Sequence, residues 1–332
     1  MSNFKELLGF LYQNQIDFAK CENVALAIGK LVKMEIIDKT KKIPLKPIER
    51  TENQVLALQN QDYKVVFNKS EIIDKIIDID KTKKIPLKPI ERTENQVLAL
   101  QNQDYKVVFN KSLKTAYRLV VGLGSTHVLE TSLTLHHIFG IPYIPGTALK
   151  GVVRMVSFWE IAKEEKKLED LQKQLYEGKL SSSENEDRIK HKLLFGTQGF
   201  KGLLVFLDAY PEISENEEIF ELDIMNVHYK SYYGDSSGKT PPGDWENPNP
   251  ITFLTVKKGI PFRFYVLFDE FRAKRILEDK DIPEKHKGML EGWINNPDNL
   301  ENLLKDWIKS ALKEFGVGAK TRLGYGIFEG DF

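Results

Sequence analysis

The chain has 332 residues, of which 41% are hydrophobic and 11% aromatic, so it holds enough apolar material for a real core. At roughly 150 residues per domain, this length predicts about two domains, or one domain with large insertions. The 48 basic residues balance the 48 acidic ones, which excludes a generally basic coat for nucleic acid but not a local basic groove.

A single cysteine, Cys21, excludes an intrachain disulfide and a zinc site built from cysteines. We therefore expect a reducing, intracellular setting, the cytoplasm. No cofactor is predicted. No run of apolar residues is long enough to predict a membrane span. The amino terminus carries Glu6 and Gln13 where a signal peptide needs an unbroken apolar stretch, so we expect no export.

An exact internal repeat stands out near the amino terminus. Residues 37–70 and 79–112 are identical at all 34 positions. Old structural repeats accumulate substitutions at their surfaces, so this identity indicates either a very recent duplication or an error in the assembled sequence. The intact mass of the purified chain distinguishes the two. Two copies are too few for a solenoid. We expect at least one copy to be a solvated loop, and the proline-broken motif IPLKPIER to be extended in both.

Two helices are predicted before the repeat, over residues 3–19 and 22–35, from apolar residues at helical spacing. Together with the duplicated segment they predict a helical amino-terminal extension over residues 1–113. The remaining residues, 114–332, are predicted to form one domain.

In that domain, the alternating stretch TAYRLVVGL (115–123) predicts a strand. A helix follows over about 148–163, with Thr147 as its N-cap. The apolar run GLLVFLDA (202–209) predicts a buried strand, and residues 211–250 form an insertion rich in proline, glycine, asparagine and aromatic residues.

The carboxyl-terminal third supplies further elements. Strands are predicted over residues 250–256 and 260–268, joined as a hairpin by a turn at Lys258 and Gly259. Helices are predicted over about 271–280 and 299–315, and the stretch TRLGYGIFEG predicts a last strand.

Apart from the extra hairpin strand, this order is β-α-β-β-α-β, which predicts an α+β, ferredoxin-like (RRM-like) domain with its helices on one face of the sheet. The other face and the loops would then be free for a single-stranded polynucleotide.

The strongest local motif is FGVGAKTRLGYG near the carboxyl terminus. It combines four glycines with a basic triplet: Gly316, Gly318, Gly324 and Gly326, and Lys320, Thr321 and Arg322. Glycines let a backbone approach a partner closely, and N–H groups and cations bind phosphate oxygens. It is not a Walker A loop, because Ala319 stands where glycine is required. A helix cap followed by a bulged strand would explain one or two glycines but not the triplet.

A second motif, IPGTALKGVVR, opens the helix predicted over about 148–163. The first N–H groups of a helix are unpaired and attract anions, and Lys150 and Arg154 lie one turn apart on one face. A solvated helix face is the alternative interpretation.

In the insertion, the stretch NVHYKSYYG offers Tyr232 and Tyr233 for stacking on bases, near Lys230. The alternative is that these tyrosines and Trp245 fold back on the sheet.

Three polar residues are candidates for catalysis. His127 or His136 could serve as the general base of a metal-independent ribonuclease, although each is also compatible with an ordinary hydrogen-bonded histidine. Asp208, at the end of an apolar strand, could be a catalytic acid, a metal ligand or the cap of the next turn.

Together these motifs resemble those of the RAMP superfamily (repeat-associated mysterious proteins) of CRISPR systems. GVGAKTRLGYG resembles the superfamily's glycine-rich loop, IPGTALKGVVR its helix-opening motif, and LLFGTQGFKGLLVFLDAYP its FG…GxL…DA segment. Longer stretches such as DWENPNPITFLTVKKGIPFRF are similar to an end-capping subunit of the type III-B (Cmr) effector, so the resemblance covers about residues 115–332.

The resemblance implies a ferredoxin-like fold with a protruding insertion. It also implies a non-catalytic subunit that binds guide RNA toward its 3′ end and caps the backbone of a complex that cleaves target RNA. The implied partners are guide and target RNA, the repeated backbone subunit, the small helical subunit and the second end-capping RAMP subunit.

Carried onto this sequence, and with two tyrosines of the insertion added, the predicted RNA-binding residues are Lys150, Arg154, Gly316, Gly318, Lys320, Thr321, Arg322, Tyr232 and Tyr233. No catalytic or metal-binding residue is predicted. Two alternatives stay open: an endoribonuclease that processes guide RNA with a histidine base, and a purely architectural subunit without RNA contact.

Overall fold

The computed structural model describes residues 88–124, 131–163, 166–177, 180–213, 217–243 and 245–332, together with three short strands before residue 68. The chain divides into two compact units. Unit 1 comprises residues 1–85, 122–141 and 214–255, and unit 2 comprises residues 86–121, 142–213 and 256–332.

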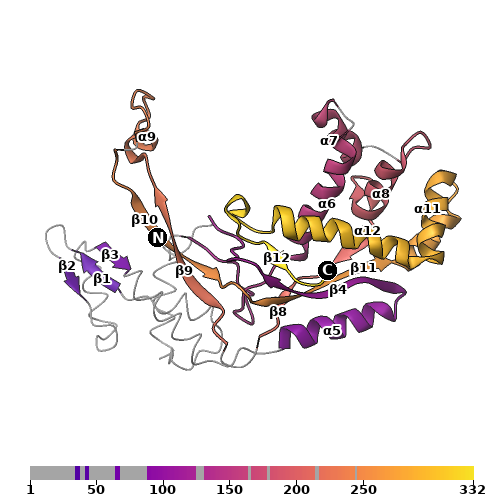
Figure 1. Ribbon diagram of the computed structural model, residues 1–332, viewed down its shortest axis with the longest axis horizontal. Coiled ribbons are helices and arrows are strands. Elements are labelled where there is room, and N and C mark those ends of the chain that lie inside the picture. The colour runs from indigo at the N-terminus through magenta and orange to yellow at the C-terminus, as the bar shows by residue number, and fades with distance from the viewer. Residues whose placement is uncertain are drawn as a thin grey trace. The chain divides into compact units, whose positions relative to one another are not determined.

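Unit 2 is built on an antiparallel sheet in the order β12-β4-β11-β7, with β8 also paired to β11 (Figure 1). Its strands are β4 (Tyr105–Thr115), β7 (Leu204–Phe206), β8 (Tyr210–Pro211), β11 (Pro261–Asp269) and β12 (Phe328–Glu329). β4 and β11 pair along almost their whole length, with one register shift between Val266 and Leu267. These two long strands form the centre of the mixed α/β unit.

One face of this sheet is aromatic. Phe262 and Phe264 of β11 pack edge-on against Phe328 of β12, with ring centroids 5.9 and 5.2 Å apart. Helices α6 (Gly146–Ala162) and α12 (Pro297–Ser310) contact each other; α6 also contacts β7, and α12 contacts β4. Alternate residues of β11 are buried here because side chains alternate across a strand.

The opposite face is covered by α5 (Lys88–Gln101), as Figure 1 shows. Val97 of this helix packs in a buried cluster with Leu207, Tyr265 and Leu267. The sequence predicted that this face would be free for a polynucleotide, and that prediction is wrong where α5 covers it. An apolar sheet face is stabilised by burial against a helix, and the second copy of the repeat supplies that helix.

The second copy of the repeat is therefore part of the fold and not a solvated loop. It contains α5 and the first eight residues of β4, from Tyr105 to Ser112. The described part of this copy of IPLKPIER is helical and not extended, because Lys88 to Arg92 form the first turn of α5, where proline is tolerated. The boundary predicted between residues 113 and 114 falls inside β4.

In the first copy, two short strands are described. β1 (Met34–Ile37) pairs antiparallel with β2 (Lys42–Pro44) and with β3 (Lys64–Phe67). The tetrapeptide KVVF thus pairs with β1 in the first copy, whereas in the second it belongs to β4 and pairs with β11. The helices predicted over residues 3–19 and 22–35 lie outside the described residues, except that Met34 and Glu35 are in β1.

The strand predicted over residues 115–123 is wrong. β4 ends at Thr115. The residues that follow, 116–123, contain no strand and make only an isolated bridge, between Leu119 and Val256. The strand β4 instead covers Tyr105–Thr115, and most of these residues belong to the second copy of the repeat, which was assigned to the amino-terminal extension.

The helices of unit 2 follow the sequence patterns more closely. The helix predicted over about 148–163 is confirmed as α6, that over 271–280 as α10 (Glu270–Glu278), and that over 299–315 as α12 followed by a π-helix, Ala311–Phe315. Thr147 is not the N-cap, because α6 begins at Gly146. Other helices are α7 (Leu168–Glu177), α8 (Glu186–Phe195) and α11 (Glu284–Asn295). Of the helices that the structure describes, none has the length and apolar character to cross a membrane.

In unit 1, the insertion forms a long hairpin of β9 (Phe220–Val227) and β10 (Asn249–Val256), with the short helix α9 (Lys230–Gly234) at its tip (Figure 1). The hairpin predicted between residues 250–256 and 260–268 is wrong. β10 pairs with β9, while β11 pairs with strands of unit 2.

The repeat gives a direct test of this fold. Deleting residues 37–78, one full period, leaves the sequence of α5 and β4 intact. We expect the midpoint of thermal unfolding of unit 2 to move by less than about 4 °C, since a change of 1 kcal/mol shifts a domain of this size by about that much. Deleting residues 37–112 removes both copies and should abolish cooperative unfolding. Loss of the cooperative unfolding transition in the first deletion variant would contradict the assignment of α5 and β4 to the second copy of the repeat.

Candidate nucleic-acid interface

The glycine-rich loop, residues 316–326, joins the π-helix to β12 and is bonded to its own unit along the backbone. The N–H of Val317 donates to the carbonyl of Gly326 at 2.9 Å, and that of Ala319 donates to the carbonyl of Val120 at 2.8 Å. The N–H of Gly316 donates to Ala311 at 2.9 Å and closes the π-helix. The loop backbone is therefore fixed by the fold.

Two of its glycines are required by close packing. Gly318 has a φ of 99°, and a Cβ there would lie 2.4 Å from the carbonyl oxygen of Val120. Gly326 has a φ of 68°, and its Cβ would lie 1.9 Å from the carbonyl oxygen of Val317. No side chain fits at these distances, so the approach of the loop to its own domain, and not to a ligand, accounts for both glycines.

At the tip of the loop, only part of the basic triplet is exposed. Residues 321–323 form a 3₁₀ turn, Arg322 is exposed, and Leu323 is 66% exposed, while Lys320 and Thr321 are half-buried. Lys320 adopts a left-handed conformation with a φ of 59°, which is uncommon for a residue with a side chain and is found at functional sites.

A second guanidinium beside this loop was missed by the sequence analysis. The carbonyl of Arg118 accepts a hydrogen bond from the N–H of Gly326 at 2.8 Å. Its guanidinium donates to the hydroxyl of Tyr117 at 2.8 Å, and the Tyr117 ring packs edge-on against Tyr325. Because Arg118 sat in a predicted strand far away in sequence, no local pattern indicated its position.

The helix-opening motif does not offer an open anion site at its amino terminus. The carboxylate of Asp208 accepts the backbone N–H of Gly146 at 2.7 Å, so an anion of the chain itself occupies this position. Asp208 is thus a cap, as one interpretation held, but of α6 and not of the turn that follows it.

Lys150 and Arg154 lie on one face of α6, and both are half-buried. Burial lowers the pKa of Lys150, and the charges of Arg154 and Lys201 lower it further. Burial likewise lowers the pKa of Arg154. In the part of the chain that the structure describes, neither forms an ion pair with a carboxylate. Two partly desolvated cations without a counter-ion favour the binding of an anion.

Tyr232 and Tyr233 lie in α9, in unit 1, whereas the loop and α6 belong to unit 2. Their rings pack edge-on at 5.3 Å and are 44% and 74% exposed, and Trp245 is 80% exposed. The alternative that these aromatic rings fold back on a sheet is therefore wrong. After α9, the Asp235 carboxylate accepts hydrogen bonds from the hydroxyls of Ser237 and Thr240 and also from their backbone N–H groups, and these bonds lower its pKa.

The candidate general bases gain no support from their surroundings. His127 lies outside the described residues. The Nδ1 atom of His136 accepts the backbone N–H groups of Ile138 and Phe139, at 3.2 and 3.4 Å, so it is engaged in a local turn. Across the described ranges, no group of three or more metal-ligating side chains comes together.

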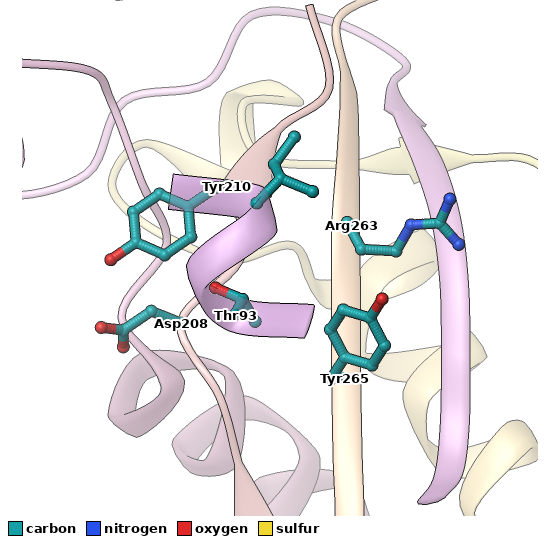
Figure 2. A pocket seen from close by; sticks show the side chains of 6 residues that line it. Thr93, Asp208, Tyr210, Arg263 and Tyr265 are labelled. Atoms are coloured by element: carbon teal, nitrogen blue, oxygen red, sulfur yellow. The ribbon is translucent and has the colours of Figure 1, made fainter. Parts of the chain in front are cut away.

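A small pocket lies where α5 meets β8 and β11 (Figure 2). Thr93 and Asp208 line it together with Tyr210, Arg263 and Tyr265. The Thr93 hydroxyl donates to the backbone of α5 at 2.9 Å, and Arg263 Nε pairs with the carboxylate of Glu212 at 2.7 Å. These polar groups are satisfied within the fold, so the pocket is a seam between α5 and the sheet.

Residues 112–329 match the RAMP superfamily, and the chain belongs to this superfamily. It is similar to a particular subunit, the CRISPR system Cmr subunit Cmr6 of Pyrococcus furiosus, with 35% identity over 248 residues that span 64% of this chain and 65% of the relative. It is 22% identical to the Cmr6 subunit of Saccharolobus solfataricus, over 65% of this chain and 56% of that protein. The chain therefore spans less than two thirds of either relative.

Two solved structures are also similar. The crystal structure of Cmr6 from Pyrococcus furiosus shares 33% identity over 69% of this chain and 98% of that chain, with a TM-score of 0.38. A cryo-EM structure of the type III-B Cmr-beta complex bound to cognate target RNA contains a chain with 18% identity, over 79% of this chain and 74% of that chain, with a TM-score of 0.49. The resemblance predicted from the motifs is confirmed by the superfamily match and the sequence relatives.

Substitution at the packed glycines tests the loop geometry. We expect Gly326→Ala to lower the free energy of unfolding by more than about 2 kcal/mol, because the new Cβ collides with backbone and the φ is positive. Gly151→Ala in α6, where a Cβ meets nothing within 4 Å, is the matched control and should stabilise by up to about 1 kcal/mol. Chemical denaturation measures both. Equal effects would contradict the loop packing.

The buried histidine beside α6 predicts a pH dependence. Burial lowers the pKa of His191 to about 3, and the charges of Arg154 and Lys192 add to this. In the unfolded chain this histidine binds a proton as the pH falls below about 6.5, whereas in the folded chain it stays neutral down to about pH 3. The contribution of neutral His191 to the free energy of unfolding is therefore complete above pH 6.5 and is lost as the pH falls toward 3.

His191→Gln removes that titration. Between about pH 6 and pH 4, the unfolding free energy of the variant should fall less steeply than that of the wild type, by up to about 1.4 kcal/mol per pH unit. Identical slopes in urea titrations would contradict the neutral, buried state of His191.

Proposed function

We propose that the chain is a non-catalytic, RNA-binding subunit of a type III-B (Cmr) CRISPR ribonucleoprotein. The observation that carries the proposal is the glycine-rich loop. Its backbone is fixed against its own unit, while Arg322 is exposed at the tip, next to Lys320 and Thr321. An exposed cation on a fixed backbone suits phosphate oxygens, because little conformational entropy of the loop is lost when RNA binds.

The proposed ligand is guide RNA near its 3′ end, and the proposed place is an end of the complex, where the subunit caps the backbone and supports cleavage of target RNA by other subunits. Membership of the RAMP superfamily and similarity to Cmr6 support this placement. The proposed protein neighbours are the repeated backbone subunit, the small helical subunit and the second end-capping RAMP subunit, in the cytoplasm.

The proposed contact residues extend beyond the loop tip. Lys150 and Arg154 add a second phosphate contact on α6, and Tyr232 and Tyr233 at the tip of the insertion offer exposed rings for stacking on bases. Gly316 and Gly318 belong to the interface through the backbone that they shape.

We further propose a ferredoxin-like topology for unit 2. The chain order β4, α6, β7, β11, α12, β12 and the sheet order β12-β4-β11-β7 support it. Since α5 covers one sheet face, the RNA would be bound by the loop and the helix, and not across the sheet as in an RRM.

The absence of a nuclease role is part of the proposal. His136 is engaged in a turn and Asp208 caps α6, so neither is poised to move a proton of a bound RNA. Guide RNA incubated with the protein in EDTA should remain intact.

Replacing the two cations of the loop tip tests the RNA contact. We expect Lys320→Ala/Arg322→Ala to weaken binding of guide RNA by about tenfold or more, since each charged hydrogen bond contributes about 1.5–3 kcal/mol. The slope of log K against log salt should become shallower by roughly 1.4 if each cation neutralises one phosphate of a single strand.

The matched control is Lys305→Ala/Lys309→Ala, which removes two exposed charges from α12. It should leave affinity and slope close to those of the wild type. Equal losses of affinity in the two double variants would show that only the net charge of the protein matters. No loss of affinity in either variant would exclude the loop from the RNA interface.

A further inference from the structure

A buried histidine, and not a carboxylate, holds the guanidinium of Arg154. The Nε–H of Arg154 points to Nε2 of His191 at 3.4 Å, and the guanidinium carbon lies 5.8 Å from the centre of the Tyr176 ring. His191 is 1% exposed and comes from α8, while Tyr176 comes from α7. Arg154 is therefore held from two neighbouring helices, although it forms no ion pair.

The tautomer of His191 follows from its second contact. Its Nδ1 atom lies 3.1 Å from the hydroxyl of Ser157, a residue of α6 that is 1% exposed. Since a guanidinium can only donate, Nε2 must be the acceptor, and the ring proton must be on Nδ1, where it donates to Ser157. The lowered pKa of the buried ring agrees with a neutral imidazole in this role.

A neutral acceptor has a consequence that a carboxylate would not have. A carboxylate would orient the guanidinium and also cancel its charge, whereas imidazole orients it and leaves the full positive charge. Only Nε is used, so the remaining N–H groups of Arg154 are available to a second, anionic acceptor.

The nearby charges are arranged to the same effect. Lys150, Arg154 and Ser157 lie at positions i, i+4 and i+7 of α6, hence on one stripe of the helix. The pKa of Lys150 is lowered by burial and, to a lesser extent, by the charges of Arg154 and Lys201. Lys201 itself has a counter-ion, since its ammonium lies 3.9 Å from the Asp269 carboxylate. The carboxylate of Glu184, which lies near α8, is bound instead by the buried Lys192 and faces His286.

We propose that His191 and Ser157 position Arg154 for phosphate, so that Arg154 and Lys150 form a phosphate-binding site for the backbone of a single RNA strand. This inference rests on the proposed RNA-binding function and deepens it. His191 is a positioning residue and does not touch the RNA. The site is separate in sequence from the glycine-rich loop and adds its own contribution to affinity.

A double-mutant cycle on the full chain tests the coupling, with fluorescently labelled single-stranded guide RNA as the probe. We expect Arg154→Ala to weaken binding about tenfold, as expected for one charged hydrogen bond, and His191→Leu to weaken it by a similar factor. The double variant should bind no more weakly than Arg154→Ala alone, because His191 acts through Arg154. His191→Gln keeps an acceptor and should restore most of the affinity.

The salt dependence of binding and a second variant distinguish positioning of Arg154 from a general loss of structure. The salt slope of His191→Leu should become shallower by roughly 0.7, the value for one phosphate contact to a single strand, which general destabilisation does not produce. If His191→Leu fails to unfold cooperatively, Ser157→Ala replaces it, since loss of the Nδ1 acceptor frees the tautomer and should also weaken binding.

The failures are distinguishable. Additive losses in the cycle, or full affinity in both His191→Leu and Ser157→Ala, would overturn this inference while the proposed function stands. A wild-type chain that does not bind RNA would overturn the proposed function, and this inference with it.

Discussion

The geometry of the candidate interface depends on two contacts between glycine and backbone, Gly318 against Val120 and Gly326 against Val317. They let the loop lie on the domain closely enough for backbone hydrogen bonds to fix both of its ends. Arg322 and Leu323, which lie between these contacts, are then exposed on a rigid base. Because the ordering of the loop is achieved on folding, it need not be repeated on binding, which is the physical basis of preorganisation.

The second cation site uses a different physical effect. Arg322 is exposed, so its attraction to a phosphate is screened by water and salt. Lys150 and Arg154 are half-buried and lie in a medium of lower effective dielectric, where the same attraction is stronger and the unpaired charge is costlier. A protein that holds such cations away from carboxylates gives up some stability, and RNA binding recovers it.

Local patterns predicted α6, α10 and α12, because apolar periodicity and turn residues determine such helices. The sequence motifs also located the glycine-rich loop. Local patterns did not predict β4, because most of it lies in the exact repeat, which was assigned to the amino-terminal extension. They also did not predict the partner of β10, since strand pairing depends on residues distant in sequence. His191 could not be found in advance, because its contact with Arg154 joins residues 37 positions apart on different helices.

The most direct test is the density of the assembled complex with guide RNA. The account predicts that the guanidinium of Arg322 lies within about 2.7–3.2 Å of a phosphate oxygen of the guide, the distance of a charged hydrogen bond. A complex in which this loop tip contacts only protein, with every guide phosphate bound by other surfaces, would contradict it.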